Sequence, residues 1–374
     1  MRFVFNTHVD DPASRAAITG LCRRLHDAGV DATLNDWSGY APYDVAVFLG
    51  YDHELERAKR ERPGIRVVLA DPKQSRPEWI EAARRADLLV VSSVEQREPF
   101  LRVNSNVHVF EMFPPTDPVE KVHRDAETVV IGYHGNRVHL EAMAASVRPA
   151  LEELGRRRSV ELRAVYNVAA NGRARIGVPD KRFVRVRHVQ WSDETMAGEL
   201  AGSDIGIVPN LLPIRDRLRA LETTAYREPE FMYEPFDHLV RFKASANAGR
   251  IYPFAQLGIP VVTDFAPSAS QLVEDGVSGF VVAGPHGWLA AFERLAESAE
   301  LRNAFAAALR ARVDEVYARQ VPAFLAACAA PARPAPAALP EVTPPEDELA
   351  LASRFSKPGE TGRARAWLRR VARR

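Results

Sequence analysis

Cysteine is scarce in this sequence, and long apolar runs are missing from it. Its 374 residues contain two cysteines, Cys22 and Cys328, which are far apart and in no metal-ligand spacing. Such usage is typical of a reducing compartment rather than of a disulfide framework. No apolar run reaches the ~18 residues of a membrane span, and the first residues, MRFVFNTHVDD, lack the pattern of a secretory signal. We therefore expect a cytoplasmic protein.

Excess charge is also missing. The formal net charge is +1, which does not favour a nucleic-acid partner. A hydrophobic content of 46% and a charged content of 26% are ordinary for globular proteins. Because a single core tends to stop growing beyond ~250 to 300 residues, the length indicates two domains and a tail.

Short apolar runs alternate with longer amphipathic ones along most of the chain. This alternation predicts βα units and parallel sheets. The expected strands cover residues 2–6, 44–49, 65–70, 87–92, 107–110, 128–133, 160–166, 183–189, 204–208, 260–263 and 279–282. The expected helices cover residues 13–28, 52–62, 76–86, 94–102, 137–157, 193–201, 245–257, 268–274 and 286–319.

Proline-rich segments divide the chain. The run Phe113–Pro118 interrupts the alternation, and residues 331–345 form a Pro/Ala-rich linker. We predict a Rossmann-like domain over 1–115, a second over 119–325, and a linker with a basic tail over 329–374. Residues 211–240 interrupt the second array as a charged and aromatic insertion.

The segment Arg241–Phe280 carries the most specific pattern. It contains Ala255, a G-x-P-V-V turn and strand from Gly258, and a V-x-D-G-x-x-G run from Val273. In this order and spacing it resembles the group 1, family 4-like glycosyltransferases. The resemblance implies the GT-B fold, with two Rossmann-like domains whose parallel sheets face a central cleft. The second domain would hold the nucleotide-sugar donor, and the first would lie on the acceptor side.

This sequence departs from the family at one pattern. Many members carry two glutamates eight residues apart where Ser245 and Pro253 stand here. The chain instead has a K-x-S-x-N-x-x-R pattern formed by Lys243, Ser245, Asn247 and Arg250, similar to that of some polysaccharide-forming relatives. A helix starting near Ser245 would present N–H groups to a diphosphate, and Lys243 and Arg250 would add charge-assisted contacts. Alternatively, Ser245 caps the helix and both cations face solvent.

Three other loops are expected to line the donor site. Gly135 and Arg137 follow a strand in a turn that lets a diphosphate approach, although a tight turn without ligand explains them equally. Pro209 and Asn210 end a strand at the carboxyl edge, where ligands bind in open α/β sheets. The third is the loop with Asp264 and Ser268. His134 and His139 are either surface histidines or ligands. The residues predicted to bind the donor are Gly135, Arg137, Pro209, Asn210, Ser245, Asn247, Asp264 and Ser268.

The loop after the first strand supplies a candidate base. His8 stands near Asp10 and Asp11, and a histidine beside carboxylates can take a proton. Asp11 is better explained as a cap of the following helix. We predict Lys243, Arg250 and His8 as the catalytic residues.

The resemblance implies a hexosyltransferase that moves a sugar from a nucleotide-sugar to a glycan or lipid-linked acceptor in cell-surface polysaccharide or glycoconjugate synthesis. No Asp-x-Asp pair, Cys/His cluster or Walker-type loop is seen in the ordered region. We therefore expect no metal and no cofactor besides the donor. Two alternatives stay open, a nucleotide-sugar epimerase and a catalytically silent GT-B scaffold that binds a protein partner through the insertion.

The end of the chain is basic. Trp367, Leu368 and Val371 would lie along one side of a helix in Gly362–Arg374, with arginines elsewhere. This pattern suits an anionic membrane surface, whereas an unstructured basic tail explains it nearly as well. The first interpretation predicts a peripheral location on the inner face of the membrane.

Overall fold

The computed structural model describes residues 1–11, 14–73, 76–112, 116–210 and 248–336. These residues belong to one compact unit, Met1–Pro336. The predicted domain boundaries at residues 115, 119, 325 and 329 stay predictions.

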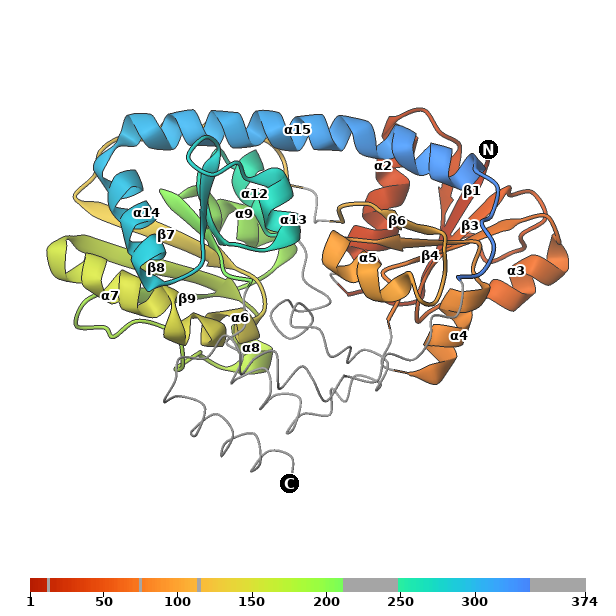
Figure 1. Ribbon diagram of the computed structural model, residues 1–374, viewed down its shortest axis with the longest axis horizontal. Coiled ribbons are helices and arrows are strands. Elements are labelled where there is room, and N and C mark those ends of the chain that lie inside the picture. The colour runs from red at the N-terminus through yellow and green to blue at the C-terminus, as the bar shows by residue number, and fades with distance from the viewer. Residues whose placement is uncertain (12–13, 74–75, 113–115, 211–247, 337–374) are drawn as a thin grey trace, which may run out of the picture. The chain divides into compact units, whose positions relative to one another are not determined.

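Six parallel strands form the first sheet in the order β2-β1-β3-β4-β5-β6 (Figure 1). Its strands are β1 (Phe3–Asn6), β2 (Ala32–Leu34), β3 (Val45–Leu49), β4 (Arg66–Ala70), β5 (Leu88–Val91) and β6 (Val107–Val109). The helical segments between them are η1 (Arg15–Gly20), α2 (Leu21–Asp27), α3 (Leu55–Glu61), α4 (Pro77–Arg85) and α5 (Val94–Phe100).

The central strands of this sheet are buried on both faces. In β1, Phe3 and Phe5 belong to one apolar cluster and Val4 to another on the opposite face. Neighbouring side chains of a strand point to opposite faces, so a strand covered on both sides has to be apolar throughout. This explains why the apolar runs of the sequence predicted β1, β3, β4 and β5 correctly.

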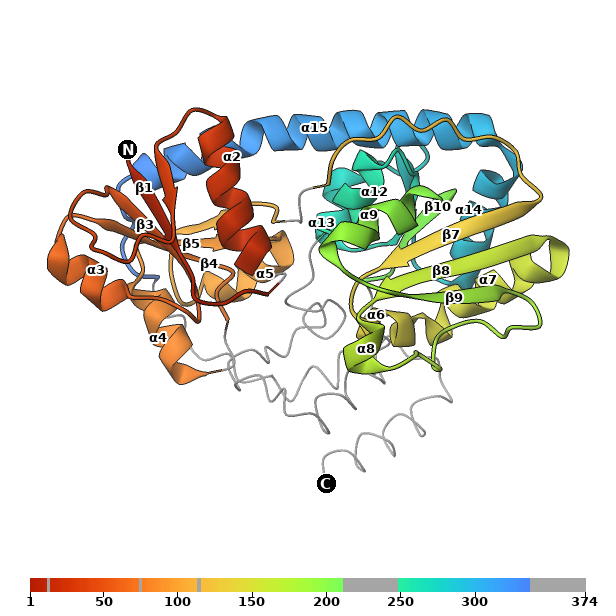
Figure 2. The same cartoon turned by 180° about the vertical axis from the view of Figure 1, so that it is seen from behind.

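The second sheet has six parallel strands in the order β12-β11-β10-β7-β8-β9 (Figure 2). Its strands are β7 (Thr128–His134), β8 (Ser159–Tyr166), β9 (Arg185–Gln190), β10 (Ile205–Val208), β11 (Val261–Asp264) and β12 (Gly279–Val282). Its helical segments are α6 (Arg137–Ala142), η2 (Met143–Ala145), α7 (Val147–Arg157), α8 (Val168–Asn171), α9 (Asp193–Ala201), α12 (Ile251–Gln256), α13 (Pro267–Leu272), α14 (Pro285–Glu297) and α15 (Ala299–Ala329).

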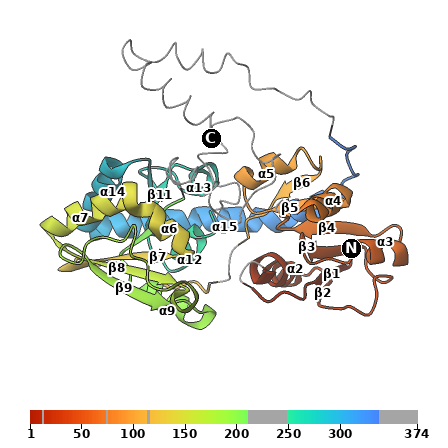
Figure 3. The same ribbon diagram turned by 90° about the horizontal axis from the view of Figure 1, so that it is seen from below.

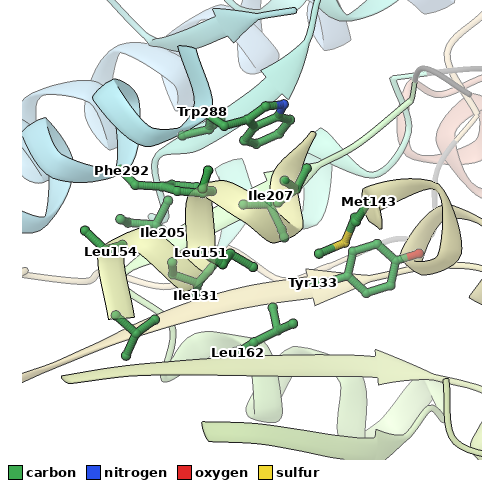
Figure 4. Packing of buried hydrophobic residues seen from close by; sticks show 14 of the residues in the cluster. Ile131, Tyr133, Met143, Leu151, Leu154, Leu162, Ile205, Ile207, Trp288 and Phe292 are labelled. Atoms are coloured by element: carbon green, nitrogen blue, oxygen red, sulfur yellow. The ribbon is translucent and has the colours of Figure 1, made fainter. Parts of the chain in front are cut away.

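Two apolar clusters hold the helices against the second sheet. Figure 3 shows α6, α7 and α14 along one side of it, where Leu151 of α7 and Trp288 of α14 share a cluster with Ile131 of β7. Figure 4 shows these side chains together with Phe292 and Ile207. Helices α9, α12 and α13 contribute to the second cluster, which contains Val261 of β11.

Helix α15 contributes to clusters of both sheets. Its Leu309 and Val313 pack with α12 and α13, whereas Phe324 and Cys328 pack with Phe3 and Cys22 of the first sheet's cluster. A helix of this length extends about 1.5 Å per residue, which lets one element reach both sets of strands. Helix α15 therefore packs against residues of both sheets.

The α/β class and the two Rossmann-like parallel sheets predicted for a GT-B chain are confirmed by this topology. Several element predictions were wrong in detail. Strand β2 and helix α8 were missed, because three and four residues are too short for a periodic pattern. The helix expected over 137–157 breaks at Ser146, and the one over 286–319 breaks at Ser298 and continues to Ala329.

The break at Ser298 has a local cause. The Ser298 side chain accepts a hydrogen bond from the backbone N–H of Leu301 at 3.0 Å, so it acts as the N-cap of α15. Gly29 follows α2 with a φ of 76°, a conformation that glycine adopts without strain, so the chain can turn away from the helix there.

We predict that Phe324→Ala lowers the free energy of unfolding by about 3 to 5 kcal/mol, the usual cost of emptying a buried phenylalanine site. Phe324 is fully buried, and its ring lies 6.0 Å from that of Phe3 and 5.9 Å from that of Phe110. Urea unfolding measures the loss. Phe265→Ala is the matched control, because Phe265 is 60% exposed. Equal losses in the two variants would contradict this account of how α15 is held.

Candidate functional site

The carboxyl ends of β7, β10 and β11 meet at one edge of the second sheet. These strands are hydrogen-bonded neighbours, with Ile207 paired to Tyr133 and Val208 paired to Thr263. Ligands of open parallel sheets bind at this edge. The residues that follow or end the three strands include Gly135, Asn210 and Asp264, so the structure brings three of the predicted donor residues together.

Arg250 joins this edge from the turn before α12. Its Nη2 donates a hydrogen bond to the Pro209 carbonyl oxygen at 2.6 Å and a second one to Oδ1 of Asn210. The Nη1 atom is buried and has no hydrogen-bond partner within the described part of the chain. The guanidinium is therefore held by Pro209 and Asn210, with the Tyr133 hydroxyl beside it, and Nη1 is the one of its atoms that is buried without an acceptor among the described residues.

The helix behind Arg250 differs from the prediction. We expected it to open near Ser245 with Arg250 two turns in, but the described helix begins at Ile251, and Arg250 is its N-cap residue. Residues 248–250 form a bend and a turn. Lys243, Ser245 and Asn247 lie outside the described residues, so their predicted contacts with a diphosphate stay predictions.

Asn210 and Asp264 are hydrogen-bonded to each other within this cluster. The backbone N–H of Asn210 donates to Oδ2 of Asp264 at 2.7 Å, and both residues are buried. Burial lowers the pKa of Arg250, whereas the Tyr133 hydroxyl and the Asp264 carboxylate beside it favour the charged form. An arginine keeps its charge under such conditions, so the cluster contains a buried cation and a buried carboxylate. Nδ2 of Asn210 is a second buried donor without a partner among the described residues.

Gly135 has to be glycine for two reasons. Its φ is 136°, a backbone conformation that other residues rarely adopt, and a Cβ atom there would lie 2.8 Å from Cδ of Arg250. The glycine thus gives the arginine stem the space that it occupies. The predicted close approach at Gly135 is present, but the atoms that approach are those of Arg250.

His134 connects the end of β7 to the turn at Arg250. Its Nε2 donates to the Arg250 carbonyl oxygen at 2.9 Å, and its ring meets that of Phe254 edge-on. Burial lowers the pKa of His134 to about 4, although the hydrogen bond to Arg250 favours the protonated form. His134 and His139 are both buried, so the surface interpretation of these two histidines is wrong.

Arg137 is engaged away from this cluster. Its Nε donates to Glu141 at 2.8 Å, and its Nη1 donates to the carbonyl oxygen of Asn171. His8, the predicted base, is exposed and stacks on Trp37 with the ring centroids 3.8 Å apart. Asp11 accepts a hydrogen bond from the N–H of Ser14 at 2.7 Å, which agrees with the capping interpretation.

Ser268 is bound by a residue that sequence reasoning missed. Its N–H and its hydroxyl both donate to Oε1 of Glu95, at 3.0 and 2.8 Å. Glu95 belongs to α5 and is buried. Burial, followed by the charge of Glu95, raises the pKa of Glu111 to about 8. No sequence signal singled out these glutamates, because each stands alone in an ordinary amphipathic or loop segment.

Within the described ranges, no group of three histidine, cysteine, aspartate or glutamate side chains is arranged to hold a metal ion. No helix within those ranges is long and apolar enough to cross a membrane.

Comparison with known proteins gives structural likeness only. No family model and no curated protein matches the chain. TarM of S. aureus is similar at 12% identity and a TM-score of 0.47, over 76% of this chain and 55% of TarM. HepE of Anabaena, solved with UDP, is similar at 14% identity and a TM-score of 0.49, over 87% of this chain and 100% of HepE. A glycosyltransferase of Rickettsia africae is similar at 11% identity and a TM-score of 0.45, over 87% of this chain and 84% of that protein.

The chain thus spans only about half the length of TarM. At these identities and scores, what the neighbours bind is not transferred to this chain.

We predict that Gly135→Ala lowers the free energy of unfolding by about 1 to 3 kcal/mol, because strain at such a φ and the contact with Arg250 both act against the folded state. Gly198→Ala is the matched control in α9, since nothing lies within 4 Å of a Cβ there. That exchange is expected to stabilise the helix by about 0.5 to 1 kcal/mol. Chemical denaturation compares the two, and a neutral Gly135→Ala would contradict the close contact.

We predict that His134 makes the folded state less stable as the pH falls from about 6.5 to about 4. The unfolded chain takes up a proton in this range while the folded one stays neutral, so protonation favours unfolding. His134→Gln has no such proton, so the stability difference between it and the wild type should change in this pH range. Urea unfolding at pH 7 and pH 5 measures it, and a pH-independent difference would show that His134 titrates normally.

Proposed function

We propose that this protein is a glycosyltransferase that moves a sugar from a nucleotide-sugar to a glycan or lipid-linked acceptor. The observation that carries the proposal is a pair of buried donors, Arg250 Nη1 and Asn210 Nδ2, which have no acceptor among the described residues and lie at the carboxyl edge of the second sheet. Buried donors of native proteins nearly always have an acceptor. A diphosphate supplies several acceptor oxygens and two negative charges for the guanidinium.

In the proposed reaction the bond between the anomeric carbon and the diphosphate breaks, and the acceptor hydroxyl forms the new glycosidic bond. Negative charge grows on the departing diphosphate. Arg250, fixed by Pro209 and Asn210, would stabilise that charge without having to reorganise. Because this contact strengthens as the bond breaks, its loss should lower turnover more than donor binding.

The other predicted residues complete the proposal. Lys243, outside the described residues, would add a second cation to the diphosphate. His8 is proposed to accept the proton of the acceptor hydroxyl, and its exposed ring leaves it accessible. Ser268 would reach a donor only after releasing Glu95. Metal independence, hexosyl transfer, a role in cell-surface polysaccharide synthesis, and a cytoplasmic or peripheral membrane location belong to the proposal as well.

We predict that one nucleoside diphosphate among UDP, GDP, ADP and the corresponding sugars raises the unfolding temperature of the protein. A ligand at 100 times its dissociation constant adds about 2.7 kcal/mol to the free energy of unfolding. Arg250→Lys keeps a charge but cannot donate to Pro209 and Asn210 while also reaching the ligand, so it should weaken binding tenfold or more. Differential scanning fluorimetry measures both effects.

Arg60→Ala serves as the control, because Arg60 is exposed on α3, away from the second sheet. A stabilising nucleotide whose effect survives in Arg60→Ala and falls in Arg250→Lys and Lys243→Ala supports the proposal. If no nucleotide stabilises the folded wild type, the transferase assignment fails.

A further inference from the structure

A basic pocket lies at the other edge of the second sheet. It is formed where α7 leads into β8 and where the preceding loop leads into β9, at the amino ends of these strands. Its volume is about 640 Å³. The candidate donor site is at the carboxyl edge, so the two sites are separate.

The lining of this pocket carries charge of one sign. Six of its residues are cationic and none is acidic: Arg156, Arg157, Arg158, Lys181, Arg182 and Arg185. Four carboxylates outside the lining pair with some of them: Glu153, Glu161, Asp180 and Glu293. Glu161 is shared, because it also binds Arg163 at 2.9 Å.

Two of the cations have no carboxylate partner. Arg158 and Lys181 make no ion pair with any described residue, and Nε of Arg158 is buried without a hydrogen-bond acceptor there. Arg185 is largely exposed and lies 3.5 Å from Glu161. Such exposed ion pairs are weak, so the pocket retains an excess of positive charge.

Two of the arginines lie against an aromatic ring. Arg156 and Arg182 lie against the ring of Phe183, with guanidinium-to-ring distances of 4.3 and 5.4 Å. Gly155 permits this arrangement, because a Cβ atom there would lie 2.3 Å from the Phe183 carbonyl oxygen. The end of α7 at Gly155 therefore packs directly on the backbone at Phe183, in the segment that leads into β9. This contact holds the basic residues 156–158 beside the basic residues 181–185.

We propose that this basic pocket binds phosphate groups of an anionic ligand. Five of the six cations are arginines, whose planar fork matches phosphate oxygens in pairs. Both the headgroup of an anionic phospholipid and a soluble oligophosphate carry this chemistry. The site would add an anchor for such a ligand whether or not the carboxyl edge binds a nucleotide-sugar.

The test uses the full chain and two double variants. Lys181→Ala with Arg185→Ala removes two exposed cations of the pocket, and Arg23→Ala with Arg60→Ala removes two exposed cations from the helices of the first sheet. The probes are vesicles of phosphatidylcholine with phosphatidylglycerol, vesicles of phosphatidylcholine alone, and tripolyphosphate. Each lost cation near an anionic surface should weaken binding about fivefold, so we expect about a 25-fold loss in the pocket variant.

Each outcome decides the proposal. Binding of the mixed vesicles alone identifies a lipid headgroup as the source of phosphate, and binding of tripolyphosphate identifies a soluble one. Both require that the pocket variant binds more weakly than the control variant while its unfolding temperature and its nucleotide response match the wild type. If no probe binds, or if both double variants lose affinity equally, the pocket is not a phosphate site.

Discussion

The carboxyl edge of the second sheet is held together by the hydrogen bonds from Arg250 to Pro209 and Asn210. They join the turn before α12 to the end of β10, two segments that are separated in sequence by the residues outside the described ranges. The same arginine receives a hydrogen bond from His134 at its carbonyl oxygen, so β7 is tied to it as well. Three strand ends are thereby arranged around one buried cation.

A buried cation of this kind is costly unless its surroundings compensate it. Asp264 supplies the opposite charge nearby, and Gly135 supplies the space for the arginine stem. Nη1 of Arg250 is buried without an acceptor among the described residues, which is unusual for a purely structural cation. The need to place charge and space around Arg250 explains why Gly135, Asn210 and Asp264 meet here, although none of them forms a motif alone.

The sequence predicted the strands well where burial on both faces required apolar residues, as in β1 and β3. The resemblance implied one donor site that includes Gly135, Asn210, Asp264 and Arg250, and the structure brings these four residues together. Arg137, His8 and Ser268, which belonged to the same prediction, contact other residues instead. The sequence could not predict the contact between Glu95 and Ser268, since these residues are 173 positions apart and neither is part of a pattern. It also predicted that the helix begins near Ser245, whereas α12 begins at Ile251. Serine is a common N-cap residue, but its presence alone does not determine where a helix begins.

The two cysteines lie in the cluster that holds the end of α15 against the first sheet. Cys22 and Cys328 are free, buried, and members of the same apolar cluster, and burial raises their pKa to about 11 and about 12. Thiols in this state react slowly, because the reagent needs an exposed thiolate. Reaction of either one with a thiol reagent therefore reports how often the end of α15 detaches from the first sheet. The rate of thiol modification is therefore a measure of the local opening of α15.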